Sequence, residues 1–174
     1  MPVAGAIDVL SDMRQGYSAC PGYSQVVDLN PDTLGPSVDV ALLADSVQAV
    51  RGKLFILGGG WDTLWVRQFP ARHPSLAIGL RLRIPTSWHS DEINLSVELQ
   101  DADGKSIFPQ PLSQQIRLPK TNDSQTTDIG LVRSFTFNNL LFGHEGSYSF
   151  VISVDDDPVS RLRFSVRQRS DEPK

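Results

Sequence analysis

Aliphatic residues occupy every second position from Leu76 to Ile84, and this alternation constrains the fold more than any other feature of the sequence. Successive side chains of a β-strand point to opposite faces, so the pattern predicts a strand with one apolar and one polar face. Arg81 and Arg83 fall on the polar face, and Pro85 ends the strand. The apolar face holds Leu76, Ile78, Leu80, Leu82 and Ile84. A face of this kind must be covered by a second layer.

The same alternation recurs in residues 93–99, 148–154 and 162–166, with turn residues between the segments. Asp101 and Gly104 predict one turn, in which the aspartate caps the backbone and the glycine takes a positive φ. Residues 38–45 and 52–57 predict a first hairpin, and residues 135–137 predict a further strand. No window of eleven or more residues keeps a capped helical period. The pattern therefore predicts an all-β fold, an antiparallel β-sandwich of seven or eight strands.

The end of the chain favours an immunoglobulin-like form of this sandwich. Gly146-Ser147-Tyr148 precedes an alternating strand and then a final strand, which is how many immunoglobulin-like domains close. Residues of the same parity on three strands should share one apolar layer. The residues predicted to be buried together are Leu80, Leu82, Leu95, Val97, Phe150 and Ile152.

The length of 174 residues fits one domain with an appendage. Residues 1–36 contain four prolines and only one short apolar patch, so they predict a weakly structured N-terminal extension. We expect this extension to be followed by a β-sandwich domain over 37–168 and a disordered tail over 169–174.

The apolar run Lys53-Leu54-Phe55-Ile56-Leu57 ends in Gly58-Gly59-Gly60-Trp61. A phosphate-binding loop needs a helix that opens directly after its glycines, and the next residues predict none. We therefore expect a structural signature, in which at least one of the three glycines takes a positive φ and bends a strand. Trp61 should then cover an open end of the sandwich and be mostly buried.

This glycine signature, together with Leu80-Arg81-Leu82-Arg83-Ile84-Pro85 and the strand from Leu95 to Asp101, resembles a family of small uncharacterised proteins found mainly in actinobacteria. Members share an Ala-Asp pair near the start, here Ala44-Asp45, a Gly-Lys-Leu-Tyr/Phe-Ile-Leu-Gly-Gly-Gly-Trp signature and a terminal Gly-x-Tyr strand. The resemblance covers residues 38–167 and supports the fold, whereas residues 1–36 depart from it. The family implies no activity.

The charges are nearly balanced, because 16 Lys and Arg residues stand against 20 Asp and Glu, with no block of one sign. This balance argues against an extended nucleic-acid or anionic-membrane surface. The apolar runs are far shorter than the ~20 residues that a membrane helix needs. The single cysteine, Cys20, cannot form an internal disulfide, and no apolar signal region precedes it. We expect a cytoplasmic protein that binds neither nucleic acid nor membrane.

No set of residues predicts catalysis. His73, His89 and His144 stand singly, without a second ligand at a metal spacing, and no Gly-x-Ser-x-Gly motif occurs. The run Asp155-Asp156-Asp157 is the first place to look for calcium, although aspartates in turns more often cap the backbone. We expect no catalytic residue, no metal and no cofactor.

Trp65 and Trp88 are the candidate binding residues, with Asp62 and His89 beside them in the sequence. Exposed indole rings can form a stacking platform for a sugar, a peptide or a protein. Three functions follow: a non-catalytic interaction or accessory module for a protein partner in a bacterial cytoplasm, a carbohydrate-binding module that uses Trp65 and Trp88, and an enzyme whose residues, such as His89, Asp62 and a serine, meet only in the fold.

Overall fold

The computed structural model describes residues 35–119 and 127–169, which form nine strands and no helix. This is more than the seven or eight strands expected. The predicted extension over 1–36 and tail over 169–174 lie almost entirely outside the described residues, so they stay predictions. The strands are β1 (Ser37–Val50), β2 (Lys53–Gly59), β3 (Thr63–Val66), β4 (Ala71–Pro85), β5 (Glu92–Gln100), β6 (Leu112–Arg117), β7 (Asp128–Phe142), β8 (Gly146–Val154) and β9 (Asp157–Gln168).

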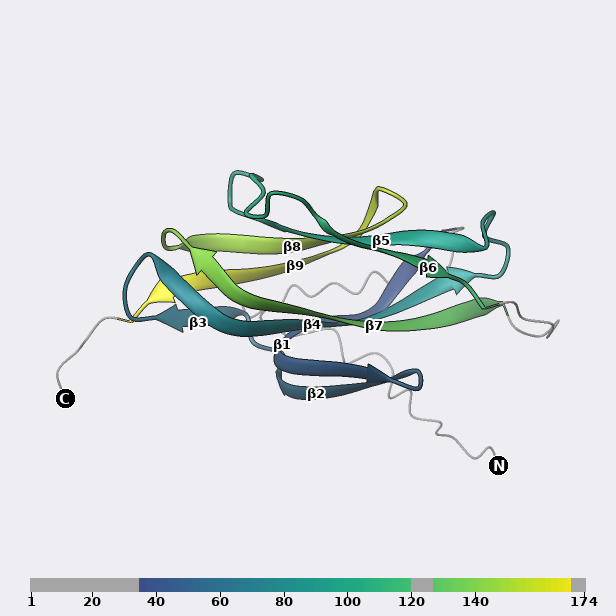
Figure 1. Cartoon of the computed structure of the whole chain (residues 1–174), viewed down its shortest axis with the longest axis horizontal. Coiled ribbons are helices and arrows are strands. Elements are labelled where there is room, and N and C mark those ends of the chain that lie inside the picture. Colours follow the sequence, from purple (N-terminus) through teal and green to yellow (C-terminus); the bar gives the residue numbers. More distant parts are fainter. Residues whose placement is uncertain (1–34, 120–126, 170–174) are drawn as a thin grey trace, which may run out of the picture.

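The strands form two sheets that lie over one another (Figure 1). Sheet A has the order β2-β1-β4-β7, and sheet B has the order β3-β9-β8-β5-β6. The expected antiparallel arrangement is wrong at one place, because β3 runs parallel to β9. β3 belongs to the sheet opposite β1 and β2, and it reaches β9 through the connection that contains the glycine signature.

The apolar layer between the sheets confirms the predicted parity. All six residues predicted to share a core are fully buried in one cluster, to which both sheets contribute. The five aliphatic residues of β4 are also fully buried, whereas Arg81 and Arg83 lie half exposed on the outer face of sheet A. The alternation of residues 76–84 therefore predicts correctly which side chains of β4 face the core, without information from elsewhere in the chain.

A third layer forms where the β1–β2 hairpin folds under sheet A (Figure 1). β1 pairs with β4 through Ser37–Ala44 and then with β2 through Ala44–Val50, so its second half leaves the sheet. Val47 of this half packs with Leu54 of β2 against Ala77 of β4. A Cβ on the neighbouring Gly79 would lie 3.2 Å from Cγ1 of Val47. Two small residues on the outer face of β4 thus make room for the hairpin.

The glycine signature bends the chain as expected, because Gly58 has a φ of 61° and Gly60 a φ of 90°. Trp61 is half-buried, and so less covered than expected, since it lies in the connection between β2 and β3. Its ring packs edge-on against Phe164, with the centroids 6.0 Å apart.

The two aspartate turns close hairpins of sheet B. Oδ1 of Asp101 accepts hydrogen bonds from the backbone N–H groups of Asp103 and Lys105, and Gly104 has a φ of 77°, as predicted. Asp155 and Asp156 both have positive φ values, which is the geometry of a type I′ hairpin turn. The Asp155 carboxylate accepts the N–H of Asn94 at 2.7 Å.

Candidate functional site

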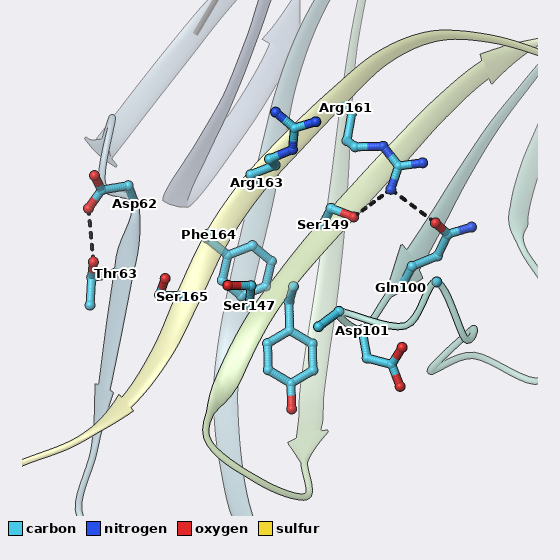
Figure 2. Close-up of a pocket in the computed structure, with 13 residues that line it drawn as sticks. Asp62, Thr63, Gln100, Asp101, Ser147, Ser149, Arg161, Arg163, Phe164 and Ser165 are labelled. Atoms are coloured by element: carbon cyan, nitrogen blue, oxygen red, sulfur yellow. Dashed lines mark hydrogen bonds between the residues drawn. The ribbon is translucent and has the colours of Figure 1, made fainter. Parts of the chain in front are cut away.

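A concave site lies on the outer face of sheet B, where a pocket of about 460 Å³ opens over β8 and β9 (Figure 2). Its floor follows from strand parity. Tyr148 and Phe164 point into the core, so the serines and arginines between such residues point outward. The polar residues that line the pocket are Asp62, Thr63, Gln100, Asp101, Ser147, Ser149, Arg161, Arg163 and Ser165.

Strand pairing arranges these side chains in rows across the sheet. Gln100, Ser149 and Arg163 are direct neighbours on β5, β8 and β9. Ser147, Ser165 and Thr63 are neighbours on β8, β9 and β3, which gives a row of three hydroxyl groups beside the first row. The pocket floor is thus a polar grid whose spacing is set by the sheet.

Arg161 is held in place at one end of the pocket. Its Nη1 donates to Oε1 of Gln100 at 3.1 Å and to Oγ of Ser149 at 2.9 Å, and Ser149 is itself buried (Figure 2). A guanidinium group carries five N–H donors, so three remain on Nε and Nη2. Both partners are neutral, and their contacts leave the positive charge of Arg161 uncompensated.

Arg163 is exposed on the same face, and no carboxylate of the described residues forms an ion pair with it. The acidic groups of the pocket are engaged elsewhere: Asp62 accepts the hydroxyl of Thr63 at 3.0 Å, and Asp101 accepts the backbone of its own turn. The pocket therefore holds two guanidinium groups that form no ion pair with a described carboxylate, together with the carboxylates of Asp62 and Asp101.

Trp65 is not one of the residues that line this pocket, but it lies two residues beyond Thr63 on the same outward face of β3. On β3, Leu64 and Val66 pack against the core, while Thr63 and Trp65 point outward, and Trp65 is 55% exposed. It lies beside Arg167, one row beyond the three hydroxyl groups. Of the predicted site residues, Asp62 lines the pocket and Trp65 lies beside it on the same face of sheet B.

Trp88 and His89 lie at the opposite end of sheet B. They precede β5, whose Asn94 bonds to Asp155 in the turn before β9, whereas Trp65 lies beside the last residues of β9. Trp88 is half-buried against the core and packs on His89, with the ring centroids 4.3 Å apart. The two tryptophans do not form one platform, and His89 does not join Asp62 and a serine.

A second exposed feature is the apolar edge, which we define as Val50, Phe55, Ile56 and Leu57 of the β1–β2 hairpin. Phe55 is 57% exposed, Ile56 42% and Leu57 69%, three large apolar residues in succession. β2 is the outermost strand of sheet A as described, so one side of its backbone is unpaired. Exposed apolar residues on a free strand edge are typical of a protein-binding surface.

Sequence reasoning did not identify Arg161 and Arg163, or the apolar edge, as site residues. The sequence did hold a signal for the two arginines: they alternate with Leu162 and Phe164, so they occupy the outward positions of that strand. The exposure of Phe55 and Leu57 had no signal in the sequence, because a run of apolar residues is equally typical of a buried strand.

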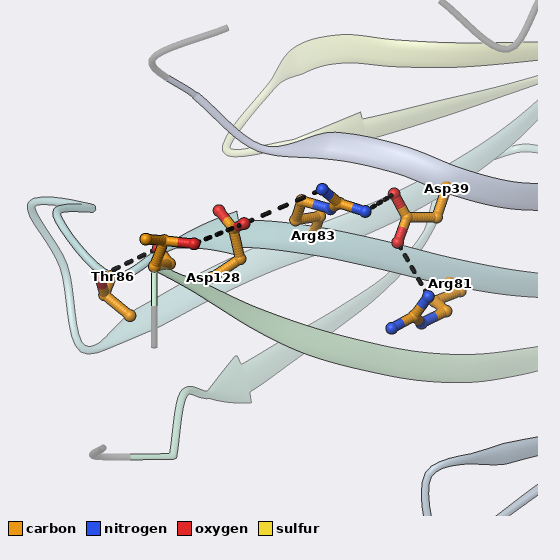
Figure 3. Close-up of polar contacts among 6 residues, drawn as sticks. Asp39, Arg81, Arg83, Thr86 and Asp128 are labelled. Carbon is orange, nitrogen blue, oxygen red and sulfur yellow. Dashed lines mark hydrogen bonds and ion pairs between the residues drawn. The ribbon is translucent and has the colours of Figure 1, made fainter. Parts of the chain in front are cut away.

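The outer face of sheet A carries an ion-pair network that binds its strands together (Figure 3). Asp39 of β1 lies 3.1 Å from Arg83 and 3.1 Å from Arg81, the second contact without hydrogen-bond alignment, and Arg83 lies 3.9 Å from Asp128 of β7. Asp39, Arg81, Arg83 and Asp128 thus form ion pairs that join the three neighbouring strands β1, β4 and β7. We interpret the network as structural.

The described residues contain no group of three or more His, Cys, Asp or Glu side chains placed to hold a metal ion. They also include no helix of the length and apolarity needed to cross a membrane. Burial lowers the pKa of His73 and raises the pKa of Tyr148, whose hydroxyl donates to the carbonyl of His144 at 2.8 Å. His73 lies on β4 of the other sheet, whereas Tyr148 is among the residues that line the pocket.

A family model described as "Family of unknown function (DUF6941)" matches residues 39–167. No curated protein matches the sequence. Among solved structures, "Pseudomonas fluorescens alkylpurine DNA glycosylase AlkC bound to DNA containing an abasic site analog" aligns with a TM-score of 0.37 and 6% identity. That alignment covers 76% of this chain but only 30% of the glycosylase chain, so the chain spans less than a third of it.

Proposed function

The chain belongs to this family of unknown function, and from that premise we propose that it is a non-catalytic interaction module of a bacterial cytoplasm. Its contact surface is the apolar edge, and its partner is a second copy of the same chain. The observation that carries the proposal is the exposure of Phe55, Ile56 and Leu57 on an outermost strand.

The backbone of β2 supports pairing with another strand. The two-residue turn Arg51-Gly52 closes on Val50 and Lys53, so these two residues form a hydrogen-bonded pair and the pairs alternate from there. Phe55 and Leu57 direct their backbone groups to β1, whereas Leu54 and Ile56 direct theirs to the free edge. Those unpaired groups are a template for strand addition.

The sequence of β2 supports a second copy as the partner. Two β2 strands that pair antiparallel about Ile56 place Phe55 of one copy opposite Leu57 of the other, so that large apolar side chains meet in pairs. Lys53, the only charged residue of β2, then lies opposite Gly59. No like charges face each other in this arrangement.

Sedimentation velocity across a range of protein concentrations tests the proposal. We expect the wild type to dimerise and the double variant F55E/L57E to stay monomeric, because four carboxylates would be forced together. Leu141→Glu is the matched control, since Leu141 is 46% exposed on β7, away from the hairpin. A wild type that is monomeric at every concentration contradicts the second-copy proposal.

A charge-pair experiment tests the register of the pairing. In the F55K/L57E variant, opposite charges face each other across the two-fold axis, whereas in F55K/L57K like charges do. We expect F55K/L57E to dimerise and F55K/L57K to stay monomeric. Equal behaviour of the two variants would contradict pairing about Ile56 even if a dimer forms.

Saccharide binding at the outer-face pocket is a second candidate function, favoured by the exposed ring of Trp65, which lies one row beyond the three hydroxyl groups on the same face. An aromatic ring stacks on the apolar face of a sugar, while hydroxyl groups exchange hydrogen bonds with its edge. This candidate keeps Trp65 and Asp62 from the sequence-based hypothesis and omits Trp88. A glycan array on the wild type and Trp65→Ala tests it, and the absence of any Trp65-dependent signal contradicts it.

We also propose that the fold is an immunoglobulin-like sandwich with an inserted hairpin. The order β1-β4-β7 corresponds to strands A, B and E of that fold, and β9-β8-β5-β6 corresponds to G, F, C and C′. Tyr148, at the start of the strand that corresponds to F, bonds to the backbone four residues upstream, as in a tyrosine corner. Backbone NOEs that fail to connect β3 with β9, or β5 with β6, would contradict this assignment.

A further inference from the structure

We propose that the outer-face pocket binds acidic oligosaccharides, with Arg163 and Arg161 recognising a sugar carboxylate and Trp65 stacking on a neighbouring sugar ring. This inference rests on the second candidate function above and names the chemical class of its ligand. It is independent of dimerisation through the apolar edge.

The charge of the pocket favours a carboxylate. Arg161 keeps three free N–H donors on Nε and Nη2, the edge of a guanidinium group that matches two carboxylate oxygens. Arg163 lies two residues along the same face of β9, and no described carboxylate pairs with it. The third arginine of this face, Arg167, is already paired with Glu145 at 3.0 Å. Two guanidinium groups without an ion pair among the described residues therefore lie together at the Arg161 and Arg163 end of the pocket, away from its carboxylate Asp62 beside β3.

The rows of the sheet fix the size of the ligand. Arg163, Ser165 and Arg167 occupy successive outward positions of β9, and Trp65 lies beside Arg167. Four residues of a strand span about 13 Å, so Trp65 and Arg163 are about two sugar units apart. The hydroxyl groups of Ser147, Ser165 and Thr63 lie between them and can bond to sugar hydroxyls. An acidic disaccharide or trisaccharide spans this distance, and a single sugar does not.

Isothermal titration calorimetry with trigalacturonate as the probe tests the inference, and its methyl ester serves as a matched neutral ligand. We expect the acid to bind about tenfold more tightly than the ester, because each charge-assisted pair contributes roughly a factor of ten. Arg163→Gln should weaken the acid about tenfold and leave the ester unchanged. Trp65→Ala should weaken both ligands. Arg72→Gln, an exposed arginine on β4 of the other sheet, is the control that should change neither.

Each other outcome overturns a distinct part of the proposal. Equal binding of acid and ester would refute carboxylate recognition while saccharide binding stands. Competition by acetate or phosphate at the affinity of the acid, together with normal binding by Trp65→Ala, would indicate an oxyanion site that does not recognise sugars. Absence of binding by either ligand would refute the inference, and the glycan array then shows separately whether the second candidate function stands. Thermal melting of every variant shows whether a loss of binding comes from a loss of folding.

Discussion

Gly58 shows at the scale of one residue why the signature glycines cannot carry side chains. Its φ of 61° is unfavourable for any residue with a Cβ, and an added Cβ would overlap the carboxylate of Asp45. Gly104 has a similar φ of 77° but open space around the Cβ position. A comparison of the two glycines therefore distinguishes the cost of the left-handed backbone, which both share, from the cost of steric overlap, which occurs at Gly58.

We expect Gly58→Ala to destabilise the fold more than Gly104→Ala, which should cost about 1–2 kcal/mol from the left-handed conformation alone. Chemical denaturation of both variants measures the two costs. In an Asp45→Ala background the excess at Gly58 should shrink, since most of the overlapping atoms are gone. An equal cost at the two glycines would show that Asp45 moves away freely.

His73 gives the stability of the fold a dependence on pH. It lies on β4 opposite Leu140 of β7, its Nε2 is buried without a described partner, and burial lowers its pKa below 6.5, with opposing contributions from Ser75 and Asp45. The unfolded chain therefore binds a proton at a higher pH than the folded chain does. Stability is complete above about pH 6.5, falls as the pH drops below that value, and levels off below the folded pKa.

Urea unfolding at pH 8 and pH 5.5 measures this contribution. We expect His73→Gln to lose less stability than the wild type between these two values, because glutamine does not titrate. Asp45→Asn should lose more, since the carboxylate that favours the charged imidazole is removed. An identical loss in the wild type and His73→Gln would assign the pH dependence to other groups.

The position of the β1–β2 hairpin depends on its packing against the outer face of β4. Val47 and Leu54 of the hairpin pack on Ala77 and Gly79 of β4. Added methyl groups at Gly79 would occupy the space of the Val47 side chain. The hairpin can therefore be displaced by a change on β4 that leaves the core untouched.

We expect Gly79→Val to cost about 1–3 kcal/mol by overpacking and to speed amide hydrogen exchange in β1 and β2. Exchange in β5 and β8 should stay as slow as in the wild type, because these strands lie in the other sheet. Gly143→Val is the control, since a Cβ there meets open space and its φ is not positive. Uniform acceleration across all strands would mean that the hairpin and the core unfold together.

At the scale of the whole molecule, one apolar core unites the two sheets. Leu82 of sheet A and Leu95 of sheet B are both fully buried in it, as are the aromatic rings of Phe142 and Phe150. We expect Leu82→Ala to cost about 2–5 kcal/mol, because the removed atoms leave a cavity. Tryptophan fluorescence and far-UV circular dichroism should report the same unfolding midpoint for this variant. Arg72→Ala on the same strand should change stability little, and a similar cost at both positions would contradict the common core.

The parity of β4, β5, β8 and β9 and the chemistry of two turns could be predicted from the sequence. The alternation at Leu80 and Leu82 and the aspartates at 101 and 155 act locally, since side-chain direction and turn geometry depend on neighbours along the chain. Asp62 and Trp65 were also chosen as candidate binding residues from the sequence, as polar and aromatic residues beside the glycine bend, and they stay candidates. Their partners in the pocket could not be found in this way.

Only the tertiary structure decided which strands meet and which faces stay open. The parallel pairing of β3 with β9 brings Trp65 and Thr63 beside Ser165, a residue about a hundred positions away in the chain. The folding of the hairpin under sheet A leaves Phe55 and Leu57 exposed, although their sequence is that of a core strand. The tertiary structure also places Trp88 at the end of sheet B opposite Trp65. These outcomes depend on contacts between distant segments, and the energy of such contacts is not encoded in any local pattern.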